Sequence, residues 1–114
     1  MRAYELMAIF DGELDDAGLD ASIARVDTSI RDKSGSIATT AKWGKRRFAY
    51  EINHRHDGYY VVVEVLAEPG ALDDLERQLR LADDVVRHKL IRLPDHEAAR
   101  RGLVTDEAAP AAAG

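Results

Sequence analysis

The chain has 114 residues, no cysteine and a formal net charge of -5, from 16 Lys and Arg against 21 Asp and Glu. This length fits one small domain with a single core, and the lack of cysteine excludes disulfide frameworks and thiolate chemistry and is typical of a reducing cytosol. Glu5 interrupts any apolar signal-peptide core and no apolar run has the length of a membrane span, so the sequence predicts a cytosolic protein with no membrane partner.

The first half of the chain alternates between extended and helical patterns. Residues 3–10 have a period of two, which predicts a strand with one buried face. The next apolar residues recur at helical spacing: Leu19, Ile23, Val26 and Ile30. Asp15 or Asp16 is available to cap this helix. A second extended segment covers residues 36–53 and is broken by Gly44, where we expect a β-bulge or a close backbone approach.

The second half repeats this pattern with different lengths. It predicts, in order, a turn at residues 53–58, a strand at 59–67, a helix opened by Pro69, a turn at Asp83-Asp84 and a strand at 85–93. Pro94 then breaks the pattern, and nothing from Thr105 onward has the apolar residues to bury a face. We therefore expect a domain of residues 1–94 and a flexible, Ala-rich tail of residues 95–114.

The order strand, helix, strand, strand, helix, strand predicts an α+β fold made of a split pair of βαβ units, the ferredoxin-like arrangement. Right-handed crossovers then place both helices on one face of a four-stranded antiparallel sheet, with the first and third strands in its centre. The other face is left open. We expect it to carry Ala3, Glu5, Met7, Ile9, Tyr60, Val62, Glu64, Arg87, Lys89 and Ile91.

The segment Lys42–Tyr50 concentrates positive charge and aromatic rings in an acidic chain. Residues 42–47 hold four cations and no acid, while much of the acid lies in residues 11–20 and 73–76. Cations neutralise phosphates, and rings offer faces to unstacked bases, so this segment fits an RNA-contacting strand. A solvated edge strand whose charges prevent unwanted pairing fits equally well. The net negative charge predicts weak RNA binding by the protein alone and a need for a basic partner.

No arrangement for catalysis or for a cofactor emerges from the sequence. The serines lie outside any Gly-x-Ser-x-Gly elbow, there is no glycine-rich phosphate loop, and the paired acids sit where helices and turns begin. His54 and His56 lack a third metal ligand nearby. We therefore expect no enzyme, no cofactor, no metal and no small-molecule substrate. The alternatives are a small-molecule regulatory domain with its ligand between the paired helices of a dimer, and a metal-dependent or acid-base enzyme.

Four motifs resemble the bacterial ribosomal protein S-six family, in the same order and at the same spacing. They are Met1–Glu5, Trp43–Ile52, Gly58–Tyr60 and Val85–Lys89, and the resemblance spans residues 1–93. It implies a ferredoxin-like fold and a structural, non-enzymatic role in the small ribosomal subunit. The family binds the central domain of the small-subunit ribosomal RNA together with ribosomal protein S-eighteen, so both are implied partners here, in support of subunit assembly and translation.

Carried over residue by residue, the resemblance implies a set of residues that contact RNA or the partner protein. These are Arg2, Lys42, Trp43, Lys45, Arg46, Arg47, Tyr50, Arg87, Lys89 and Arg92. The sequence does not separate the two roles, nor does it tell whether Trp43 stacks on a base or packs on protein. Because the tail lacks the long acidic run of relatives, the tail modification known in the family is not carried over.

Overall fold

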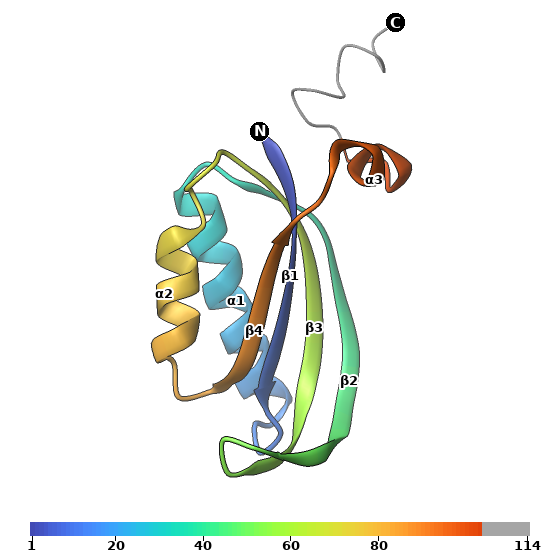
Figure 1. Cartoon of the computed structure of the whole chain (residues 1–114). Helices are drawn as coiled ribbons and strands as arrows, with labels where there is room; N and C mark the ends of the chain where they lie inside the picture. Colours follow the sequence, from blue (N-terminus) through green and yellow to red (C-terminus); the bar gives the residue numbers. More distant parts are fainter. Residues whose placement is uncertain (104–114) are drawn as a thin grey trace, which may run out of the picture.

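The computed structural model describes residues 1–103, which form a four-stranded antiparallel sheet, two long helices on one of its faces, and a short third helix at one end (Figure 1). The elements are β1 (Arg2–Asp11), α1 (Asp16–Asp32), β2 (Ser36–Ile52), β3 (Arg55–Ala67), α2 (Asp73–Leu81), β4 (Val85–Arg92) and α3 (Asp95–Arg100). The strand order is β2-β3-β1-β4, so β1 and β3 are central. The predicted fold class is confirmed. No helix within residues 1–103 has the length and apolar character needed to cross a membrane.

The core lies between the sheet and the two long helices, and the sequence pattern explains it. Asp15 caps α1, because its carboxylate accepts a hydrogen bond of 2.7 Å from the Gly18 backbone N–H. The predicted apolar stripe of α1 then packs on the helix-facing side chains of β1 and β3, among them Leu6, Phe10 and Val63, all fully buried. Each such Leu, Phe or Val contributes about 1.5–3 kcal/mol by leaving water.

The turn between β2 and β3 is shorter than predicted, and β3 is correspondingly longer. The turn is Asn53-His54, with positive φ angles of 50° and 63°, and β3 already begins at Arg55. Gly58, which suggested a turn, lies inside β3. A side chain there would meet Ile9 Cγ2 at 2.6 Å and the Phe10 carbonyl at 2.8 Å, so glycine is needed for space between strands and not for a turn.

The helix expected from Pro69 begins later, at Asp73. The backbone of Gly70 has a φ of 84°, which a right-handed helix does not allow, so residues 68–72 form turns closed by hydrogen bonds from Ala71 N–H to Glu68 and from Asp73 N–H to Gly70. The apolar stripe of this helix is as predicted, since Leu72, Leu75 and Leu79 are all buried.

Residues 95–103 depart from the expectation of a tail that begins after Pro94. They form α3 and a following turn, and Ala98 (0% exposed) and Leu103 (5%) pack on Ala3 and Leu93. The sequence reasoning missed this because the apolar residues of the segment are few and their contacts lie at the distant start of β1. Figure 1 shows α3 at the end of the sheet where the N-terminus lies, opposite the β2–β3 turn. The remainder of the predicted tail, residues 104–114, lies outside the described residues.

Candidate nucleic-acid interface

The face of the sheet opposite the two long helices carries the residues expected there, but Ala3 is not open, because it is buried against Ala98 of α3, Leu93 and Leu103. Residues directly opposite each other on neighbouring strands share a face, and the register pairs β1 residues Glu5, Met7 and Ile9 with Glu64, Val62 and Tyr60 of β3 and with Ile91, Lys89 and Arg87 of β4. The alternate residues of β1 and β3 belong to the core under the helices. This face is therefore acidic towards the end that holds α3, and basic and aromatic towards the hairpin.

The basic segment lies on β2, an edge strand, and its cations divide between the two faces. Lys42 is opposite Val61, a core residue, so it faces the helices, and its Nζ lies 2.7 Å from Asp20 of α1. Lys45 faces the same side, with Nζ 3.9 Å from a carboxylate oxygen of Asp57 and 5.8 Å from the centre of the Tyr59 ring. These two lysines thus already bind groups of their own chain.

Arg46 and Arg47 differ from the two lysines. Within residues 1–103 neither arginine has a carboxylate partner. The guanidinium carbon of Arg46 lies 5.6 Å from the centre of the Trp43 ring, a cation–π contact, and Arg47 lies opposite Asp57 in the register. Among the Trp, Tyr and Phe side chains, Trp43 (49% exposed) and Tyr50 (69%) are the exposed ones, so the segment presents rings and free cations together.

The cations of β4 fall into two groups. Arg87 and Lys89 are exposed on the open face and have no ion pair with any residue from 1 to 103. Arg92 lies opposite Tyr4, on the other face, and its Nη2 is 3.9 Å from Asp95 of α3. Arg2 is half-buried opposite Ala67 at the start of β1. The structure therefore brings Arg46, Arg87 and Lys89 to one face, and holds Arg2 and Arg92 at the opposite end of the sheet.

Arg101 makes contacts within the chain that the sequence reasoning missed. Its Nη1 lies 3.0 Å from Glu5 and 3.2 Å from Glu64, two acids that are directly opposite each other on β1 and β3. Its Nε also donates to Glu97, at 2.8 Å. Like charges directly opposite on a sheet repel, so the single positive charge of Arg101 between Glu5 and Glu64 reduces the repulsion at this end of the open face. The available signal was the predicted pair of acids on the open face, which requires a cation from elsewhere.

Glu97 is the most strongly perturbed carboxylate of this cluster. Hydrogen bonds from Arg100 and then from Arg101 lower its pKa from 4.5 to about 2. The same hydrogen bond to Glu97, followed by those to Glu5 and Glu64, raises the pKa of Arg101 above its usual range. Glu97 and Arg101 therefore both stay charged at neutral pH.

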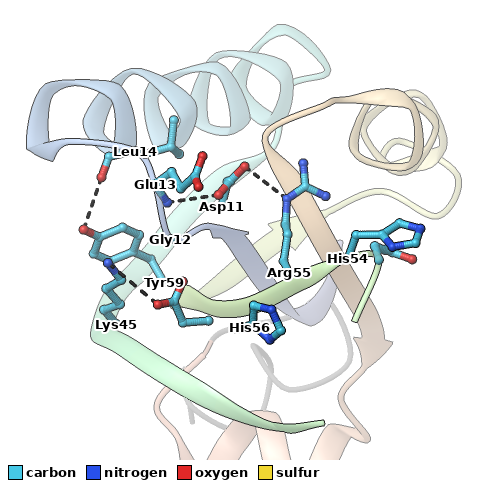
Figure 2. A pocket seen from close by; sticks show the side chains of 11 residues that line it. Asp11, Gly12, Glu13, Leu14, Lys45, His54, Arg55, His56 and Tyr59 are labelled. Atoms are coloured by element: carbon cyan, nitrogen blue, oxygen red, sulfur yellow. Dashed lines mark hydrogen bonds and ion pairs between the residues drawn. The ribbon is translucent and has the colours of Figure 1, made fainter. Parts of the chain in front are cut away.

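A polar pocket of about 810 Å³ separates the hairpin from the loop after β1 (Figure 2). The Asp11 carboxylate accepts hydrogen bonds of 3.0 Å from the Glu13 backbone N–H and from Arg55 Nε, and the bond from Glu13 is the main cause that lowers the Asp11 pKa. Arg55 also donates to the Asp83 carbonyl, at 2.7 Å. These contacts join the hairpin to β1 and to the turn before β4. Within residues 1–103 no three His, Asp or Glu side chains group as metal ligands.

Comparisons with known proteins give consistent matches. The family model described as Ribosomal protein S6 matches residues 3–92. Small ribosomal subunit protein bS6 of Beutenbergia cavernae is 45% identical over 96 residues, which are 84% of this chain and 100% of that protein. The protein of the same name from Salinispora arenicola is 44% identical over 92 residues, 81% of this chain and 96% of its own. The crystal structure of 30S ribosomal protein S6 from Thermotoga maritima superimposes with a TM-score of 0.80 at 28% identity, over 89% of this chain and 95% of that one.

Proposed function

The chain belongs to the ribosomal protein S6 family, and on this premise we propose that it binds the central domain of the small-subunit ribosomal RNA together with protein S-eighteen. Its relatives are small-subunit ribosomal proteins, which assigns it to the ribosome and so, in bacteria, to the cytoplasm. We further propose that its role is structural: it supports subunit assembly and translation and catalyses no reaction.

The observation that carries this proposal is a group of exposed cations without a carboxylate partner among residues 1–103: Arg46, Arg47, Arg87 and Lys89. Cations of this kind release counterions from RNA when they bind its phosphates, and this release supplies much of the binding free energy. The lysines at 42 and 45, whose charges are already partnered, are better assigned to holding β2 in place. The ion pairs of Glu5 and Glu64 with Arg101 reduce the repulsion that phosphates would otherwise meet on the open face.

The first test measures phosphate binding through salt dependence. The double variant Arg46→Ala/Arg47→Ala should bind a central-domain RNA fragment more weakly, and the slope of log affinity against log salt should flatten by about 0.7 to 0.9 for each phosphate that is no longer neutralised. The matched control is Arg80→Ala, which removes an exposed cation of α2 on the opposite side of the sheet. An unchanged slope in the double variant, or an equal change in the control, contradicts the proposal.

The second test concerns the basic partner. With a net charge of -5, the protein alone should bind the RNA fragment only in the non-specific range, with a Kd of roughly 10⁻⁶ to 10⁻⁴ M at physiological salt. Addition of protein S-eighteen should lower the Kd by at least about tenfold, since a basic partner supplies the missing positive charge. A titration that gives the same Kd with and without S-eighteen would refute the need for a partner.

A further inference from the structure

Trp43 occupies the extra position of a β-bulge. In the register of β2 against β3, Lys42 is opposite Val61 and Gly44 is opposite the next residue, Tyr60, so Trp43 has no partner across the strand. Gly44 has a φ of 90°, and a Cβ built on it would meet nothing within 4 Å. The glycine is therefore required for its backbone conformation alone. A bulge of this kind re-aims a side chain out of the regular alternation of the strand.

The bulge leaves a large apolar ring in solvent. Trp43 is 49% exposed, whereas Phe10, the largest fully buried side chain, is 2% exposed. Its one described ring contact is with the Arg46 guanidinium, at 5.6 Å. Next to the bulge, Tyr60 packs edge-on against Phe48 with 6.4 Å between ring centres, which fills the sheet surface beside Gly44. Trp43 is thus held at a defined place on the edge of the sheet without being part of its core.

We propose that Trp43 and Arg46 form a stacking platform for an unpaired RNA base. An indole face and a guanidinium plane are the surfaces on which proteins stack splayed-out bases. Arg47 follows on the other side of the strand, opposite Asp57, and has no carboxylate partner within residues 1–103, so it is available for a neighbouring phosphate of the same RNA strand. This inference rests on the proposed RNA-binding function and adds to it a contact with a base. Two acids of the same hairpin have other partners, since Asp57 lies near Lys45 and Glu51 near His54.

The test uses the fact that Trp43 is the only tryptophan of the chain, so that intrinsic tryptophan fluorescence reports this ring alone. Titration of the full chain with a short single-stranded oligoadenylate should quench the emission. An abasic oligomer of the same length carries the same phosphates and should bind without quenching. Equal quenching by both oligomers, or quenching by neither when both bind, overturns the platform.

Variants then measure what the stack contributes. Trp43→Ala should weaken binding of a labelled oligoadenylate about tenfold, within the range of roughly 5- to 150-fold seen when a stacking aromatic is removed. Trp43→Phe keeps a ring and should restore most of the affinity. Because the side chain lies outside the core, both variants should retain the melting temperature of the parent, which excludes unfolding as the cause. Equal affinity of the Ala and Phe variants overturns the inference.

Failure of the platform is distinguishable from failure of the proposed function. If Arg46→Ala/Arg47→Ala flattens the salt slope while oligoadenylate leaves Trp43 emission unchanged, the protein binds RNA through phosphates and the platform is overturned. If Trp43 emission responds to protein S-eighteen and not to RNA, the ring is a protein contact, which also overturns it. If neither the RNA fragment nor the oligomer binds with or without S-eighteen, the proposed function itself fails.

Discussion

Neighbouring cations in one short segment have different roles, because strand alternation sends them to different faces. Lys42 contacts Asp20 of α1, and such an exposed ion pair contributes about 0–1 kcal/mol. Arg46 is only four residues away, yet it covers a tryptophan ring. The motif therefore combines residues that hold the edge strand with residues that are free for a ligand. Of the two interpretations of its sequence, the edge strand is confirmed by the position of β2 in the sheet, and the RNA-contacting strand stays a prediction.

The pKa of Glu97 gives a prediction for a single residue. Its pKa of about 2 results first from Arg100 and second from Arg101, so Arg100→Ala should raise the pKa towards 4.5, and Arg101→Ala should raise it less. Because the folded-state pKa is depressed, the stabilisation from this carboxylate is fully present above its unfolded pKa of about 4.3 and is lost as the pH falls through the folded value. Side-chain carboxyl NMR titration measures both pKa values. An unshifted pKa in Arg100→Ala would disprove this assignment.

A feature of the candidate site can be predicted from the sequence when neighbouring residues determine it, and cannot when it depends on residues far apart in the chain. The Trp43-Gly44 bulge is predictable from Gly44, since glycine within a strand pattern signals a local backbone irregularity. The ion pair between Lys42 and Asp20 is not predictable, because it depends on how α1 lies across the sheet. The contact of Arg101 with Glu5 spans 96 residues. The pattern of residues along the sequence does not show contacts between positions so far apart.

At the scale of elements, the positions of helices and strands were predictable but their ends were not. The alternation in β1 and the spacing in α1 each depend on many residues, so they tolerate local exceptions. An end depends on one or two residues, and Gly58 shows how such a residue misleads. Its lack of a side chain serves a close approach to Ile9, whereas the turn is made by Asn53 and His54.

Helix α3 gives a prediction about stability. A chain that ends after Pro94 lacks Ala98, Leu103 and Arg101, so it exposes the apolar surface of Ala3 and leaves Glu5 uncompensated. Burial of one leucine contributes about 1.5–3 kcal/mol, and ordering of the segment offsets part of this, so we expect a net destabilisation of about 1–3 kcal/mol. At about 4–8 °C per kcal/mol for a domain of this size, thermal unfolding should detect it.

The matched control for this truncation is a chain that ends after Val104. It keeps α3 and removes only residues that the sequence predicts to bury no face. Its melting temperature should equal that of the full chain. If both truncated chains have the melting temperature of the full chain, α3 does not stabilise the domain. If both fall equally, the residues after Val104 contribute to stability, and the expectation that they are dispensable for folding is wrong.

At the scale of the whole molecule, charge is arranged along the sheet. The hairpin end carries the free arginines of β2, and Arg87 and Lys89 follow on β4. At the other end Glu5 and Glu64 share ion pairs with one cation of the same chain, Arg101. The net charge of -5 weakens binding of the whole molecule to RNA, but it does not show where a phosphate can approach, since the acids within residues 1–103 lie largely on the helices or in ion pairs. Local charge, which the fold determines, decides whether a phosphate approaches.

The central position of β1 has a consequence for the order of events during synthesis. This strand is made before every other element, yet both of its neighbours come later, and β4 leaves the peptidyl transferase centre roughly 80 residues after it. At about 5–20 residues per second, β1 waits roughly 4 to 16 seconds for its second edge to be covered. During that time the apolar, helix-facing side of β1 lacks the cover that the complete domain gives it. Folding of this sheet must therefore complete late, when β4 and then α3 have emerged, and a nascent-chain chaperone has a defined interval in which to act.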